Sequence, residues 1–119
     1  MNYGFPIDRV VECLNELADE DFQKRVWLAS SGPEISSFDE AICRLFDDTG
    51  LGRLLEKQSP QVLSSEIDES LRELDKLVIR ASQLFHAMPP ASMIEQPQMR
   101  EIRCAAAKVL AQMEQEGIA

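Results

Sequence analysis

The side chains that could carry chemistry are three cysteines, a single histidine and several groups of acids. Cys13, Cys43 and Cys104 are scattered along the chain, without the C-x-x-C spacing of a zinc or redox site. His86 has no cysteine or second histidine at helical spacing, so neither a metal pair nor a nucleophile with its base can be assembled. None of the acids has E-x-x-H or calcium-loop spacing. The sequence therefore predicts no catalytic residue, no metal site and no cofactor.

Cys104 is the thiol best placed for reactivity, since helical spacing puts it opposite an apolar stripe and in line with Arg100 and Lys108. Neighbouring cations lower the pKa of a thiol. The stronger interpretation is structural, because Cys104 opens a run of three alanines that lets other helices approach closely. Cys13 and Cys43 flank apolar stripes and are expected to be small buried side chains.

The densest group of acids is Glu16, Asp19, Glu20 and Asp21, four carboxylates within six residues. They bridge the end of one predicted helix and the start of the next, where some acids act as caps. Four exceed what capping requires, and the excess is suited to a basic partner. The competing interpretation is a solvated charged corner, which is common on exposed faces.

Trp27 is the only tryptophan and follows this acidic cluster closely. Together with Phe22 it flanks the basic pair Lys24-Arg25. Tryptophan and arginine are enriched among binding hot spots, which favours a partner-binding role. In a chain with few aromatic residues, Trp27 is equally suited to fill the core. Both interpretations stay open at this stage.

Length and composition indicate one soluble domain spanning residues 1–119. With 119 residues, 45% of them hydrophobic, the chain is large enough to fold without a disulfide or a metal. Its 21 acids against 12 Lys and Arg give a formal charge of -9, which opposes binding to nucleic acid or to an anionic membrane surface. No apolar run approaches the length of a membrane span, and no secretion signal opens the chain. Unpaired cysteines favour a reducing compartment, and hence the cytoplasm.

The elements that must position these residues are all helices, because no segment shows β-alternation. Apolar spacing, caps and prolines predict helices at about residues 6–18, 19–30, 38–46, 51–58, 66–88 and 97–117, and Ser59-Pro60 is suited to open a further turn. We therefore expect an all-α fold, a single-domain bundle of five to six helices around a long helix 66–88.

The long helix carries the strongest pattern, with apolar residues alternating steps of four and three behind a Ser65 cap. Leu77 and Leu84 add a third apolar row, which is typical of a globular bundle rather than a coiled coil. We expect this helix to be the buried spine. The alternative is a homodimer through the side of the helix that carries Leu77, Leu84 and Phe85.

Three short blocks of the chain are similar to a known group of proteins. They read D-F-Q-K-R-V-W at 21–27, S-F-D-E-A at 37–41 and L-F-D-D-T-G-L at 45–51. In these blocks the chain resembles small bacterial proteins of unassigned function that carry D-F-Q-x-R-x-W, S-F-x-E-A and L-F-D-D-x-G-L. The resemblance implies a bacterial cytoplasmic protein and brings no activity with it.

These observations favour a small acidic, non-enzymatic module that binds another protein with a basic surface, as an inhibitor, immunity partner or adaptor. The residues expected to contact the partner are Glu16, Asp19, Glu20, Asp21 and Trp27. The first alternative is a homodimeric helical scaffold. The second is an enzyme with a thiol or carboxylate site, which would require a deep polar cleft around Cys104, His86 or paired acids.

Overall fold

The computed structural model describes residues 6–29, 36–56 and 63–118, and every regular element in these ranges is helical. In chain order they are α1 (Ile7–Ala18), α2 (Glu20–Phe22), the π-helical segment η1 (Gln23–Trp27), α3 (Phe38–Ile42), the π-helical segment η2 (Cys43–Asp48), α4 (Leu51–Glu56), α5 (Ser65–Phe85), α6 (Pro90–Ile94) and α7 (Pro97–Gln115). The expected all-α class is confirmed. No helix in the described ranges is long and apolar enough to cross a membrane.

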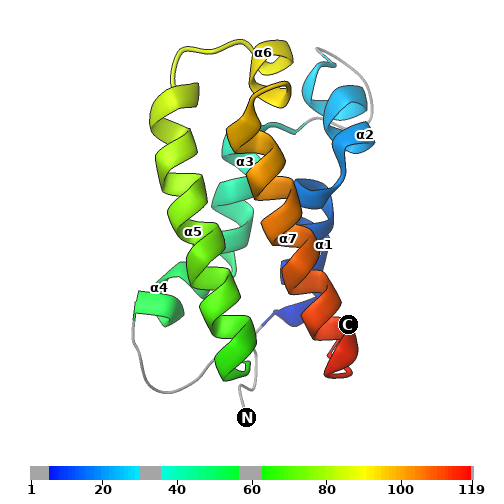
Figure 1. The fold of residues 1–119 in the computed structure, drawn as a ribbon, viewed down its shortest axis with the longest axis vertical. Helices are drawn as coiled ribbons and strands as arrows, with labels where there is room; N and C mark the ends of the chain where they lie inside the picture. The colour runs from blue at the N-terminus through cyan, green and yellow to red at the C-terminus, as the bar shows by residue number, and fades with distance from the viewer. Residues whose placement is uncertain (1–5, 30–35, 57–62, 119) are drawn as a thin grey trace.

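Two long antiparallel helices, α5 and α7, form one side of the bundle (Figure 1). α7 packs against α5 on one flank and against α1 on the other. α3 and η2 lie behind these three helices, and α1 also contacts both of them. The apolar stripes of all of these helices meet in one core.

α5 is the spine that the apolar pattern predicts, and its inward side chains are buried. Ile67, Leu71, Leu74 and Ala81 have no exposed surface. The predicted limits were slightly wrong at both ends. The N-cap is Ser64 rather than Ser65, and the helix ends at Phe85, three residues before Met88. Pro89 explains the early end, because a proline disfavours helical geometry in the residue before it.

A short helix that the sequence did not predict follows this proline. α6 begins at Pro90, whose ring suits the first turn of a helix, and occupies what was expected to be a loop. The stop predicted after η2 is confirmed, since Gly50 has the left-handed φ of 78°. Residues 57–58 of the predicted fourth helix and the turn predicted at Ser59-Pro60 lie outside the described residues.

The segment η1 buries Gln23, Val26 and Trp27 together. Residues at i, i+3 and i+4 share one face of a helix even at 3.6 residues per turn, so the glutamine lies on the same face as the two apolar side chains. The π turn of η1 holds more residues than an α turn, and it shifts the side chains that follow it around the helix axis.

Aromatic rings fill one end of the core. The ring of Phe38 packs edge-on against Trp27 at 6.2 Å between centroids, and against Phe85 at 5.2 Å. Phe85 is only 4% exposed. It was expected on the side of the long helix open to a second copy, and that part of the prediction is wrong, because Phe85 lies on the inward stripe of α5, four residues after the buried Ala81.

Candidate functional site

The acidic corner forms where α1 ends and α2 begins, and three of its four carboxylates face solvent. Asp19 caps α2 by accepting a hydrogen bond from the backbone N–H of Phe22 at 3.0 Å. Glu20 and Asp21 follow in the first turn and are exposed. The sequence-based capping argument therefore accounts for Asp19, while Asp21 has no ion pair within the described part of the chain.

Glu20 is partly neutralised by two cations. Its carboxylate lies 3.2 Å from Lys24 Nζ and 3.8 Å from a guanidinium nitrogen of Arg103 on α7. The hydrogen bond from Lys24, together with the charges of Arg103 and Lys24, lowers the pKa of the Glu20 carboxyl. The negative charge available to a partner at this corner thus comes mainly from Asp19 and Asp21.

Glu16 differs from its neighbours because its side chain points inward and is only 10% exposed. Its carboxylate accepts hydrogen bonds from the indole N–H of Trp27 at 2.8 Å and from the hydroxyl of Ser36 at 2.5 Å. Arg44 lies 3.4 Å from its other oxygen and also pairs with Glu40 at 2.7 Å. Glu16 thereby ties α1 to η1, to the segment before α3 and to η2.

The structure brings Glu16 and Trp27 together, but inside the molecule. Trp27 is 5% exposed and its polar edge is satisfied by Glu16, so it fills the core as one of the two open interpretations expected. Glu16 and Trp27 form the support of the corner, and Asp19, Glu20 and Asp21 form its surface.

A second polar support lies beneath the corner, and the sequence analysis missed it. The buried side-chain amide of Gln23 donates to the backbone carbonyls of Glu16 and Leu17 at 3.0 and 2.9 Å. Its oxygen accepts from Arg103 at 3.2 Å, and Arg103 also donates to the carbonyl of Ile94. The signal in the sequence was the i, i+3, i+4 spacing of Gln23 with Val26 and Trp27, which puts a glutamine on an otherwise apolar helical face.

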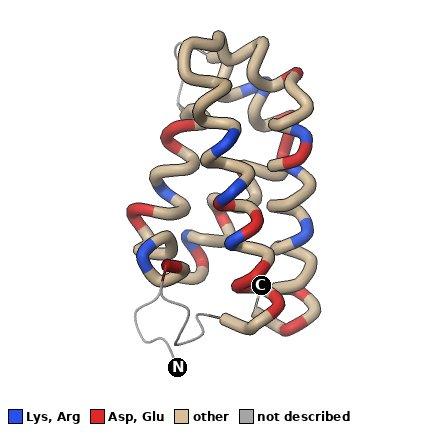
Figure 2. The backbone as a smooth tube through the Cα atoms, turned by 60° about the vertical axis from the view of Figure 1, so that its left-hand side comes forward, with Lys and Arg blue, Asp and Glu red and all other residues tan. Residues whose placement is uncertain are grey.

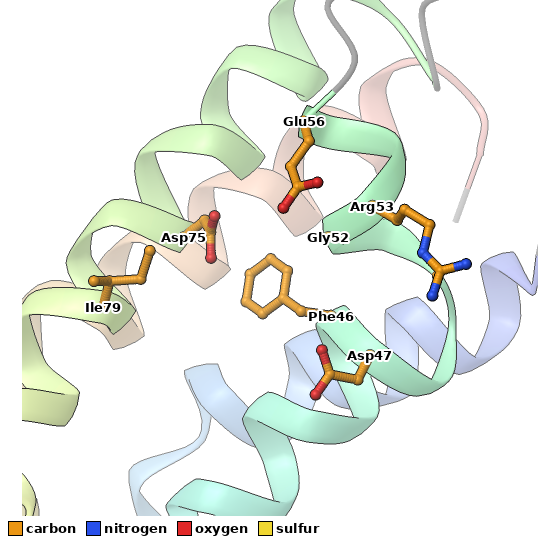
Figure 3. Close-up of a pocket in the computed structure, with 8 residues that line it drawn as sticks. Phe46, Asp47, Gly52, Arg53, Glu56, Asp75 and Ile79 are labelled. Atoms are coloured by element: carbon orange, nitrogen blue, oxygen red, sulfur yellow. The ribbon is translucent and has the colours of Figure 1, made fainter.

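A cleft with a volume of about 430 Å³ lies elsewhere, between η2, α4 and α5. Figure 3 shows Glu56 and Asp75 pointing toward the ring of Phe46, with Asp47 beside it and Arg53 directed away. Burial, and then the charge of Glu56, raise the pKa of the Asp75 carboxyl. The cleft concentrates carboxylates around an aromatic ring without a cysteine or histidine in its lining.

The cysteine and histidine candidates are not gathered into one site. Cys13 is buried, as expected, and burial raises the pKa of its thiol. Cys43 is exposed, so the expectation of a buried side chain was wrong; partial desolvation and nearby Asp47 and Asp39 raise its thiol pKa. Cys104 is exposed on α7. The cleft that His86 lines contains Trp27, Phe38 and Phe85 but no cysteine.

The family to which the chain is similar adds no chemistry to this geometry. The family described as a domain of unknown function, DUF7945, matches residues 1–117. The chain belongs to this family. No curated protein and no solved structure matches the chain. The expectation of a family without an assigned function is therefore confirmed.

For a DUF7945 domain, any functional conclusion has to come from the surface itself. No group of three or more His, Cys, Asp or Glu side chains within the described residues is arranged to hold a metal ion. What the described surface offers is an acidic corner on a rigid polar support, a carboxylate-lined cleft and the exposed flanks of the long helices.

Proposed function

We propose that this protein is a small acidic, non-enzymatic module that binds a protein partner with a basic surface, of inhibitor, immunity or adaptor type. The observation that carries the proposal is the acidic corner, where Asp19, Glu20 and Asp21 project from a backbone held by the inward side chains of Glu16 and Gln23. A rigid support favours binding because little conformational entropy is lost when the partner arrives.

The corner suits a basic protein surface because its exposed carboxylates attract cations and steer their approach. Leu28, which is 47% exposed just after η1, supplies an apolar contact in the same region of sequence. Three free thiols agree with a reducing compartment, so we place both proteins in the cytoplasm, and the resemblance of the sequence blocks favours a bacterial cell.

The test is a charge change at the corner, measured against a partner captured from the source cell. Asp19→Asn combined with Asp21→Lys keeps a capping side chain at position 19 and removes three units of negative charge. We expect slower association by surface plasmon resonance, a weaker dependence on ionic strength and an unchanged dissociation rate, because exposed rim charges mainly affect encounter.

The matched control is Asp48→Lys combined with Glu114→Gln, which changes the net charge equally at exposed positions at the end of η2 and near the end of α7. If the control slows association as much as the corner variant, the effect comes from net charge and the acidic corner is not the binding site.

A second candidate function, a homodimeric helical scaffold, is favoured by one further observation. Leu84 on α5 is 43% exposed, and Leu77 is only partly buried at the edge of the core. Both lie along the flank of α5 that faces α7, and a second copy of the chain would cover them.

A further inference from the structure

The solvent-facing groove between α5 and α7 contains two clefts in line with each other. One has a volume of about 270 Å³ and lies between Glu73 on α5 and Lys108 on α7. The other has a volume of about 300 Å³ and lies between Arg80 on α5 and Glu101 on α7. Because α5 and α7 are antiparallel, a first cleft with Glu73 and Lys108 and a second with Arg80 and Glu101 put Leu77 on α5 about level with Ala105 on α7.

Both clefts contain a glutamine whose amide oxygen lacks a hydrogen-bond donor. Gln98 lines the upper cleft and Gln112 the lower one, and the side-chain oxygen of each is buried without a partner. Each oxygen is covered by atoms of its own chain. A buried acceptor without a donor is unfavourable, so a side chain that turns outward to meet a donor relieves this cost.

Four charged residues of this groove are arranged symmetrically about Leu77 and Ala105. On α5, Glu73 lies four residues before Leu77 and Arg80 three residues after it. On α7, Glu101 lies four residues before Ala105 and Lys108 three residues after it. Within this set of four, each helix has one acid and one base at nearly equal distances from its midpoint, and two further acids of the lower cleft, Glu66 and Glu69, lie beyond the set toward the start of α5.

The two glutamines follow the same symmetry, since Gln98 and Gln112 lie seven residues on either side of Ala105. A twofold axis that lies in the interface and crosses a helix at its midpoint brings the partner's copy of that helix over it in the opposite direction. Each residue then faces the partner residue that lies equally far on the other side of the midpoint. Under that rotation every acid in the pattern meets a base and each glutamine meets the other.

From this pattern we infer that the α5–α7 groove is the surface on which a second copy of this chain docks, with the twofold axis crossing α5 at Leu77 and α7 at Ala105. Arg80 then meets the partner's Glu73, and Glu101 meets the partner's Lys108. The inference rests on the second proposed function and specifies its interface.

The same arrangement supplies these donors once the two glutamine side chains turn outward. The amide N–H₂ of Gln98 then donates to the amide oxygen of the partner's Gln112, and the reciprocal bond satisfies Gln98. The exposed apolar surface at Leu77 is covered by its own symmetry copy. None of the four charged side chains makes an ion pair within the described residues, so each is available.

The size of the surface agrees with a dimer interface. The 21 residues of α5 extend for about 32 Å, and two neighbouring helices are about 20 Å across. The resulting flat footprint is about 600 Å², and the uneven surface of the side chains adds to this area. A standard interface buries about 800 Å² per partner, so the groove is of the required order of size. The charge of -9 on each chain opposes this association, so the two reciprocal ion-pair types are needed to offset it.

The test uses two charge-reversal variants. Neither variant should pair with its own copy, but each should pair with the other. Glu73→Arg gives a protomer with two bases on α5, and Arg80→Glu gives one with two acids, so each variant repels its own copy. We expect sedimentation velocity at concentrations up to about 100 µM to show a wild-type dimer, two monomeric single variants and a heterodimer when they are mixed. The double variant, with the charges exchanged, dimerises again.

Both substitutions are at exposed positions, and circular dichroism checks that each variant is folded. The control Arg53→Glu on α4 makes the same charge change as Arg80→Glu at an exposed position away from the groove. We expect this control to dimerise like the wild type. A wild-type dimer that neither single variant weakens, or single variants that do not recombine, would overturn this interface while the scaffold function stands. A wild-type monomer would overturn both.

Discussion

At the scale of single residues, the carboxylate of Glu16 is the clearest case of an acid whose role depends on the direction of its side chain. We expect Glu16→Ala to lower the free energy of unfolding by about 1–3 kcal/mol, because it leaves the buried indole N–H of Trp27 without an acceptor. Glu16→Gln should cost less, since its amide oxygen still accepts that bond. Urea titration followed by tryptophan fluorescence measures both, with exposed Glu12→Ala on the same helix as the control.

Asp75 provides a prediction with a defined pH dependence. Burial and Glu56 raise its pKa in the folded protein, so the folded state holds the proton more tightly than the unfolded chain. Stability is therefore lost as the pH rises from the ordinary carboxyl pKa through the raised one. Asp75→Asn should raise the melting temperature at pH 7, and the gain should vanish near pH 3. An equal gain from exposed Asp48→Asn would show that the effect is only a change in net charge.

At the same scale, the sequence identified the acids of the corner but not which of them faces inward. Glu16 and Asp19 both lie near the end of α1, and their spacing alone does not distinguish a capping side chain from a buried one. The decision depends on Ser36 and Arg44, which come from distant segments of the chain. Gln23 was missed for the same reason, since its partner Arg103 is 80 residues away.

At the scale of elements, the start of α5 allows a sharp comparison between two neighbouring serines. The hydroxyl of Ser64 accepts the backbone N–H of Ile67 at 3.2 Å and donates to Glu116 at 3.0 Å. We expect Ser64→Ala to cost about 0.5–2 kcal/mol in a denaturant titration, as for other N-caps. Ser65→Ala should cost less, because position 65 is the first helical residue. If Ser65→Ala cost more stability than Ser64→Ala, the N-cap would be Ser65, as the sequence predicts.

The long helices could be predicted from the sequence and the short segments could not, for a physical reason. α5 and α7 each repeat an apolar stripe over five or more turns, and this periodicity outweighs local ambiguity. η1 and η2 last only about one turn each, which is too short for a hydrophobic period to show in the sequence. α6 owes its existence to Pro90 and to Ile94, which is buried under it.

At the scale of the whole molecule, acidic and basic positions are interspersed along the helices rather than separated onto different faces, as Figure 2 shows. This distribution bears on both proposals. A basic partner meets an excess of acid at local clusters such as the corner, and a second copy meets both acids and bases along the α5–α7 groove. The two binding modes therefore use different surfaces and do not exclude each other.

The net charge of -9 leads to the last prediction, which concerns the stability of the fold as a whole. Repulsion among the excess acids destabilises the compact state, and salt screens it over a Debye length that falls from about 30 Å at 0.01 M to about 8 Å at 0.15 M. Screening also weakens exposed pairs such as Glu20–Lys24, but a solvent-exposed ion pair contributes little to stability. We therefore expect the melting temperature at pH 7, followed by circular dichroism, to rise between these two salt concentrations. At pH 4.5, close to the isoelectric point, the net charge is near zero and the rise should disappear. A melting temperature that falls with salt at pH 7 would mean that specific ion pairs outweigh the net repulsion, and the excess acid would then not limit the stability of this bundle.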